Sequence, residues 1–209
     1  MTDVAARSPV TIMRQALRHL QAADPVMDAI IRRVGAYRIQ FREPGFETLV
    51  RSIVYQQLSG RVAQVIFDRL AGAVPDGLLT PENILALRPA KMRKLGLSKQ
   101  KTVYIRDLAR HTRDGTVDFP ALANLPDDAV IEHLTKVKGV GVWTAHMFLM
   151  FALRRTNVLP SGDLGIRADI RKAYGLAELP KPDEIEALGQ RWHPYCTVAA
   201  WYLWRSLEP

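Results

Sequence analysis

The chain of 209 residues contains a single cysteine, Cys196, and this scarcity excludes several classes of protein. One thiol cannot build an internal disulfide framework, a four-cysteine zinc site or a four-cysteine iron–sulfur cluster. The five histidines are scattered without the spacing of metal ligands, so we expect each of them on the surface or in the core. The sequence therefore predicts no metal centre.

Long apolar runs are also missing. The first ten residues, MTDVAARSPV, lack the apolar stretch of a secretory signal. The most apolar run, Trp143 to Leu153, is too short to span a bilayer and contains His146. We expect this run to form a buried helix, and we expect a soluble cytoplasmic protein that makes no use of a membrane.

The residues that are present indicate a globular, all-α protein. Hydrophobic residues make up 48% of the chain, enough for a packed interior, and the formal net charge of +8 favours a polyanionic partner. Helix-starting residues stand at Asp24, Thr80 and Ser98, and Gly35 ends the first of these helices. Only residues 37–41, YRIQF, alternate like a strand, and they are short enough to be an extended linker. We expect about ten helices joined by short turns.

A glycine hairpin at residues 138–141, Lys-Gly-Val-Gly, lies between two predicted helices. Glycines just before a helix let backbone N–H groups approach a phosphate closely, as helix N-termini do generally. The alternative is an ordinary turn between two helices with a glycine cap. Downstream, Asp163 follows a Pro-Ser-Gly turn, where it is both a favoured N-cap for a helix over Leu164 to Tyr174 and a candidate catalytic carboxylate.

These segments resemble the helix–hairpin–helix DNA glycosylase superfamily, and more narrowly its alkylpurine (3-methyladenine) DNA glycosylase II branch. The resemblance rests on GVGVWTA at 139–145, PSGDLGIR at 160–167, and the segments 46–70 and 191–204. It implies one glycosylase domain over residues 1–209, made of two helical lobes with an active-site cleft between them. The expected lobes are residues 45–157, which contain the hairpin, and residues 1–44 plus 158–209.

The resemblance assigns the chemistry to a few residues. Asp163 is the catalytic carboxylate, and Trp143 stands where lyase-active members carry a lysine that attacks the sugar. Because an indole cannot form a Schiff base, Trp143 implies a monofunctional enzyme. Trp143, Met147 and Trp204 are expected to line the base pocket, with Met147 replacing a residue that is often aromatic. A core position is the alternative for Trp143, and it is the expectation for Trp201 or its neighbour Tyr202.

Two further sets of residues are expected to hold DNA. An enzyme that extrudes a base fills the gap with a side chain, and the resemblance places this wedge at Gln57 or Leu58. The alternative is a polar helix end with Ser59 capping the next helix. The expected phosphate-binding set is the hairpin and its flanking lysines: Lys136, Lys138, Gly139, Val140 and Gly141. The other basic residues, Lys99 and Lys101 among them, are expected to form a solvated face.

The resulting hypothesis is a monofunctional DNA glycosylase that hydrolyses the N-glycosidic bond of alkylated purines in base excision repair. We expect this enzyme to act as a monomer on double-stranded DNA containing alkylated bases. In a bacterium it is expected to be associated with the nucleoid. No cofactor is expected, and a monovalent cation on the hairpin carbonyls is left open. The first alternative is a non-catalytic helix–hairpin–helix DNA-binding protein. A bifunctional lyase or iron–sulfur glycosylase is disfavoured by the missing lysine and the single cysteine.

Overall fold

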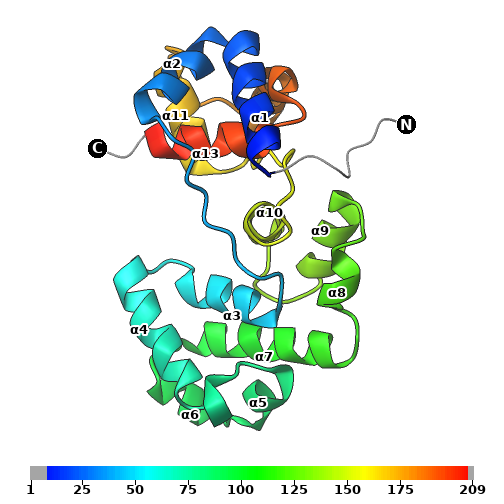
Figure 1. Cartoon of the computed structure of the whole chain (residues 1–209). Coiled ribbons are helices and arrows are strands. Elements are labelled where there is room, and N and C mark those ends of the chain that lie inside the picture. Colours follow the sequence, from blue (N-terminus) through cyan, green and yellow to red (C-terminus); the bar gives the residue numbers. More distant parts are fainter. Residues whose placement is uncertain (1–8, 207–209) are drawn as a thin grey trace. The chain divides into compact units, whose positions relative to one another are not determined.

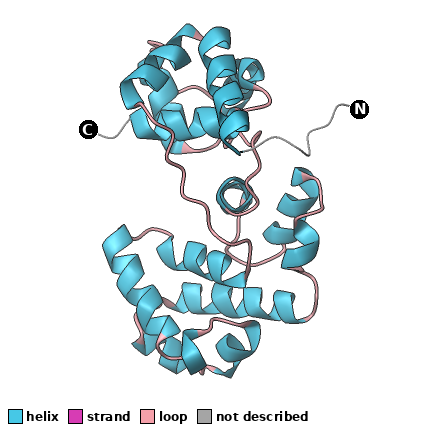
Figure 2. Ribbon diagram, in the orientation of Figure 1, coloured by secondary structure: helices cyan, strands magenta, loops and turns pink. Residues whose placement is uncertain are grey.

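A computed structural model of the chain describes residues 9–206 (Figure 1). The first ten residues, which are expected to lack a secretory signal, lie largely outside this range. Within the described residues every regular element is a helix, which confirms the all-α prediction (Figure 2). The chain divides into two compact units, residues 41–154 and the described part of residues 1–40 and 155–209. No helix in the described part is long and apolar enough to cross a membrane.

Residues 41–154, here called unit 2, contain the hairpin. Their helices are α3 (Phe46–Tyr55), α4 (Gly60–Ala71), η1 (Pro75–Gly77), α5 (Pro81–Ala86), α6 (Pro89–Lys94), α7 (Lys99–Arg113), α8 (Phe119–Leu122), α9 (Asp127–Thr135) and α10 (Val142–Phe151). The short helices α5, α6 and α8 each have a proline in the first turn, where it favours the start of a helix. The described chain therefore has thirteen α-helices and two 3₁₀ turns, more than the ten expected.

The long helix α7 organises unit 2. Ser98 caps its N-terminus by accepting a hydrogen bond at Oγ from the Lys101 backbone N–H, 3.1 Å away. Ile105 and Leu108 are completely buried on the side of α7 that packs against α3 and α5. Burial of each such side chain stabilises the fold by about 1.5–3 kcal/mol. Helix α7 is consequently a rigid support for the shorter elements around it.

The remaining helices belong to unit 1: α1 (Pro9–Ala23), α2 (Pro25–Val34), α11 (Leu164–Ala173), α12 (Pro182–Gly189), η2 (Gln190–Trp192) and α13 (Cys196–Ser206). Helix α13 packs against α1, α2 and α11 and so connects the other helices of this unit (Figure 1). Trp201 and Tyr202 of α13 are buried, which confirms their structural role.

A buried carboxylate anchors the start of α2. Asp24 is the N-cap of this helix and accepts hydrogen bonds from the backbone N–H groups of Val26 and Met27 at 3.0 and 3.3 Å. Its second oxygen accepts the Trp192 indole N–H at 3.0 Å and the Tyr174 hydroxyl. Burial and this hydrogen bond raise the pKa of Tyr174, so the hydroxyl remains a donor. The cap expected from sequence thus joins three segments of the unit.

Residues 37–41 form no strand. Tyr37 packs edge-on against Trp201, with ring centroids 4.7 Å apart, while Phe41 is 45% exposed. The Arg154 guanidinium lies 5.1 Å from the centroid of the Phe41 ring. The alternation of apolar and polar residues here reflects separate contacts along an extended linker, as expected from its length.

Candidate functional site

The hairpin joins α9 to α10 and depends on one glycine. Gly139 has a φ of +82°, in the left-handed region, and a Cβ at this position would lie 2.0 Å from a ring carbon of Tyr104. Any other residue would be strained by its backbone and would collide with that ring. Gly141 differs, because a Cβ there would have no atom within 4 Å. Gly139 therefore fixes the shape of the turn.

Two side chains from other parts of unit 2 hold the hairpin backbone. The Lys138 N–H donates to Asp107 Oδ2 at 2.9 Å, and the Gln56 side-chain amide donates to the Gly139 carbonyl at 2.9 Å. The neighbouring Val137 and Gly141 carbonyls accept backbone hydrogen bonds of 3.1 and 3.0 Å. Each of these carbonyls is thus already an acceptor within the chain.

The surface of the hairpin is basic. Lys136 and Lys138 are exposed, and Lys136 lies 3.3 Å from the Glu132 carboxylate in an exposed ion pair. Val140 is 4% exposed, so it belongs to the core, and its N–H donates to the Val137 carbonyl at 3.1 Å. Gly141 is the N-cap of α10 and supplies no side-chain cap to this helix. The backbone at this helix start suits an anion, because the first N–H groups of a helix lack partners within it.

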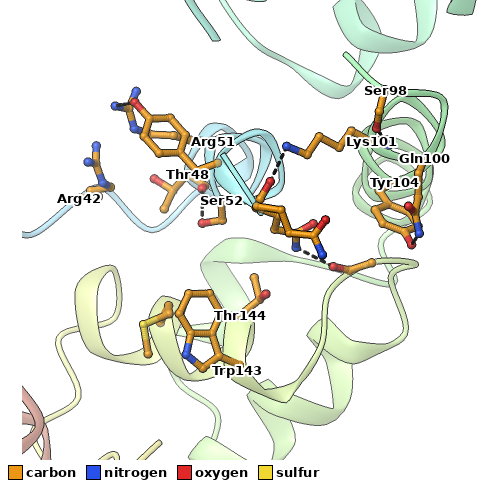
Figure 3. A pocket seen from close by; sticks show the side chains of 15 residues that line it. Arg42, Thr48, Arg51, Ser52, Ser98, Gln100, Lys101, Tyr104, Trp143 and Thr144 are labelled. Carbon is orange, nitrogen blue, oxygen red and sulfur yellow. Dashed lines mark hydrogen bonds between the residues drawn. The ribbon is translucent and has the colours of Figure 1, made fainter. Parts of the chain in front are cut away.

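A pocket of about 650 Å³ lies within unit 2, beside the hairpin (Figure 3). Trp143, Thr144 and Met147 line it from α10. Trp143 is 49% exposed, which contradicts the alternative of a core tryptophan. The predicted residues Trp143, Met147 and Gln57 thus come together around one pocket, with Gly139 of the hairpin. An exposed indole at a pocket rim is a suitable surface for stacking on a base.

The rest of the pocket wall is polar and was not anticipated from sequence. It comprises Arg42, Thr48, Arg51, Ser52, Tyr55, Gln56, Ser98, Gln100, Lys101 and Tyr104. Arg51 lies over the rings of Tyr55 and Phe67, at 4.5 and 4.9 Å from their centroids, and donates to Gln64. The spacing of Arg51 and Tyr55 on one helix was a signal for their contact. Nothing in the sequence indicated that their helix faces the hairpin.

The two wedge candidates lie in the turn between α3 and α4. Gln57 has a φ of +57°, unusual for a residue with a side chain, and it is exposed at the pocket. Leu58 is 38% exposed and is not among the residues lining the pocket. Ser59 stands at the N-cap of α4 but makes no side-chain capping hydrogen bond. The geometry favours Gln57 over Leu58 as the side chain presented beside the pocket.

Asp163 and Trp204 belong to unit 1 and contact each other there. Asp163 is the N-cap of α11, as expected, and its Oδ1 accepts the Ile166 N–H at 2.9 Å. The same oxygen accepts the Trp204 indole N–H at 2.9 Å. A Cβ on Gly165 would lie 3.0 Å from Asp163 Oδ1 and 3.3 Å from the Trp204 ring. Trp204, expected to line the base pocket, thus holds the candidate carboxylate in place.

The glycine hairpin between α9 and α10, with an exposed indole beside it, fits a helix–hairpin–helix protein. Residues 50–194 match the HhH-GPD superfamily, described as base excision DNA repair proteins. The chain belongs to this superfamily.

Similar proteins share most of the chain. DNA-3-methyladenine glycosylase 1 of Schizosaccharomyces pombe is 34% identical over 203 residues, which cover 94% of this chain and 89% of that protein. A structure of the S. pombe 3-methyladenine DNA glycosylase with abasic DNA has a TM-score of 0.81 at 33% identity, covering 91% of this chain and 95% of that one. A Bacillus halodurans DNA-3-methyladenine glycosidase has a TM-score of 0.82 at 35% identity, covering 98% and 91%.

Proposed function

We propose that the protein is a monofunctional DNA glycosylase that hydrolyses the N-glycosidic bond of alkylated purines such as 3-methyladenine. The observation that carries this proposal is Trp143, half-exposed at the pocket beside the hairpin, in a chain whose relatives are named for 3-methyladenine. An indole cannot form a Schiff base with the sugar, so water is the nucleophile. A cationic base stacked on Trp143 gains about 0.5–2 kcal/mol from cation–π attraction.

The carboxylate of Asp163 supplies the catalytic charge in this proposal. Alkylation makes the purine cationic, so the electron pair of the breaking C1′–N bond passes to the base, which leaves as a neutral molecule. The sugar acquires positive charge in an oxocarbenium-like transition state, as in glycoside hydrolysis generally. Asp163 stabilises that charge, water adds its oxygen to C1′, and the water proton leaves to solvent. Trp204 and the Ile166 N–H hold the carboxylate by hydrogen bonds to Oδ1.

The reaction needs no cofactor, because the base is already activated as a leaving group. The hairpin backbone and Lys138 hold a DNA phosphate without reading the sequence. The expected location is the compartment that holds the DNA, which in a bacterium is the cytoplasm.

Release of bases from methylated duplex DNA tests the proposal directly. The wild-type protein should release 3-methyladenine or 7-methylguanine, identified by mass spectrometry, without nicking the strand until alkali is added. Asp163→Asn should slow release by about 10²–10³-fold while DNA affinity is retained. Asparagine is a good N-cap, so α11 should remain intact in this variant.

Three outcomes contradict the proposal. Full activity of Asp163→Asn would remove the carboxylate from the mechanism. Strand nicking without alkali would indicate a lyase. DNA binding by the wild type without any base release would indicate the non-catalytic DNA-binding protein.

A further inference from the structure

Helix α7 contacts two separate segments beside the pocket through three residues spaced three apart. Lys101 contacts the turn after α3, Tyr104 packs its ring against Gly139, and Asp107 accepts the Lys138 N–H. The turn after α3 carries Gln57, and Gly139 and Lys138 belong to the hairpin. One rigid helix therefore sets the distance between the candidate wedge and the phosphate-binding backbone.

Lys101 makes the contact to the wedge turn with its ammonium group. Its Nζ donates to the carbonyls of Val54 at 2.7 Å and Gln56 at 2.6 Å. Figure 3 shows Lys101 beside the pocket. These carbonyls lie at the C-terminal end of α3, where a helix lacks internal donors and favours a positive charge. Lys101 forms no ion pair with any carboxylate in the described part of the chain. Its charge is thus directed to the backbone of this turn.

Gln56 and Gln57 have different roles in the turn. The Gln56 side chain donates to the Gly139 carbonyl, so the turn is tied to the hairpin as well as to α7. Gln57, the next residue, takes its left-handed φ of +57° and lies exposed. A non-glycine residue in this region is strained and persists only where its surroundings hold it. The contacts of Lys101 and of the Gln56 side chain hold the residues just before Gln57 and provide that support.

We propose that Lys101 is a positioning residue for base extrusion, holding the turn so that Gln57 enters the DNA at a fixed distance from the hairpin. This inference rests on the proposed glycosylase function. It also changes the interpretation of Lys101, which the sequence had placed on a solvated face. Lys101 is half-buried, and this burial lowers the pKa of its ammonium group, as expected for a lysine turned toward the protein.

A pair of substrates separates wedge positioning from a general structural role. An oligonucleotide of thymines and one guanine, which has no adenine or cytosine to be alkylated, is methylated with dimethyl sulfate to give 7-methylguanine. It is then annealed to a strand with either cytosine or a tetrahydrofuran abasic analogue opposite the lesion. Lys101→Met should slow single-turnover release from the cytosine-paired duplex by about 10²-fold, since small displacements of a positioned group have effects of this size. Opposite the abasic analogue the loss should fall below about tenfold, because an unpaired base costs less to extrude.

A double-mutant cycle with Gln57→Ala shows whether Lys101 acts through Gln57. In that background Lys101→Met should change the rate by less than about twofold, whereas independent effects would multiply. The matched control is Lys99→Met, which removes the same charge from an exposed position on α7 and should leave both rates unchanged. Melting temperatures of all variants are measured in parallel.

The outcomes distinguish this inference from the proposed function. No release by the wild type on either duplex would contradict the glycosylase function itself. Release by the wild type, with equal losses for Lys101→Met on both duplexes or with multiplying effects in the cycle, would overturn the positioning role. An equal effect of Lys99→Met would assign the loss to overall charge and would overturn it as well.

Discussion

The two units use polar side chains to hold different parts of the structure. In unit 1 the carboxylates of Asp24 and Asp169 are buried, and they accept hydrogen bonds from tyrosine, tryptophan and serine side chains. In unit 2 the side chains of Lys101, Gln56 and Asp107 hold backbone groups of turns at the surface. Unit 1 thus fixes helices through its interior, whereas unit 2 fixes the backbone that is proposed to meet DNA.

Removing the central acceptor of unit 1 should have the largest effect. Asp24→Ala leaves the Trp192 and Tyr174 donors without a partner and removes the N-cap of α2, which should lower the free energy of unfolding by about 3 kcal/mol. Urea denaturation measures the change. The matched control is Asp28→Ala on the same helix, where the carboxylate forms a surface ion pair with Arg32 and a much smaller change is expected. Equal effects of the two variants would contradict the anchoring role of Asp24.

In unit 2 the corresponding test is the hairpin glycine. Gly139→Ala imposes a left-handed backbone on alanine, at about 1–2 kcal/mol, and places its Cβ against the Tyr104 ring. We expect a lower melting temperature and loss of affinity for duplex DNA, measured by fluorescence anisotropy. Gly141→Ala should lower the melting temperature less, because its Cβ enters open space and only the N-cap preference for glycine over alanine is lost. Equal melting temperatures for the two variants would show that the hairpin tolerates a displaced Tyr104.

A smaller effect should come from the contact between Trp204 and Asp163. Trp204→Phe keeps an aromatic ring but removes the indole N–H donor to Oδ1. Loss of a hydrogen bond to a charged group is worth about 1.5–3 kcal/mol, so base release should slow by about tenfold or more. DNA affinity should be unchanged. A loss of affinity with an unchanged single-turnover rate would instead support the original assignment of Trp204 to the base pocket.

The smallest expected effect concerns the pH dependence of unit 1 stability. Burial raises the pKa of Asp169 above its ordinary value of 3.8, against the lowering effects of the Ser206 hydrogen bond and of Arg33 and Lys172. Its Oδ2 has no hydrogen-bond partner among the described residues. The folded state therefore holds this proton more tightly than the unfolded state, and stability falls as pH rises from the ordinary value through the raised one.

Asp169→Asn removes this titration, because a neutral amide does not ionise in this pH range. The amide oxygen can still accept the Ser206 hydroxyl. The unfolding free energy of the variant should not fall across that pH window. Above the window it should exceed the unfolding free energy of the wild type. Urea denaturation at a series of pH values measures both. Parallel pH profiles for the two proteins would show that Asp169 does not titrate in this range.

The residues that form local structure were predictable. Asp24, Thr80, Ser98 and Asp163 cap helices where the sequence placed their starts, because a cap and its helix are joined within a few residues. The YRIQF segment was likewise short enough to be a linker. Local chemistry was sufficient for these features, and the all-α class followed from them.

Contacts between distant segments could not be predicted in this way. Gln56 and Gly139 are 83 residues apart, and Lys101 lies 45 residues from the Gln56 carbonyl it contacts. The pattern of residues within a helix does not indicate which distant turn a lysine of that helix will contact. The contact of Trp204 with Asp163, 41 residues away, was missed for the same reason.

The sequence by itself determined the all-α fold, the glycine hairpin and the capping aspartate. Each depends on backbone preferences or on the chemistry of one side chain, and both are properties of short segments. Only the tertiary structure decided that Trp143 is exposed, that Trp204 holds Asp163, and that Lys101 supports the turn carrying Gln57. These depend on the packing of helices distant in sequence, which brings a donor to an acceptor that local sequence cannot specify.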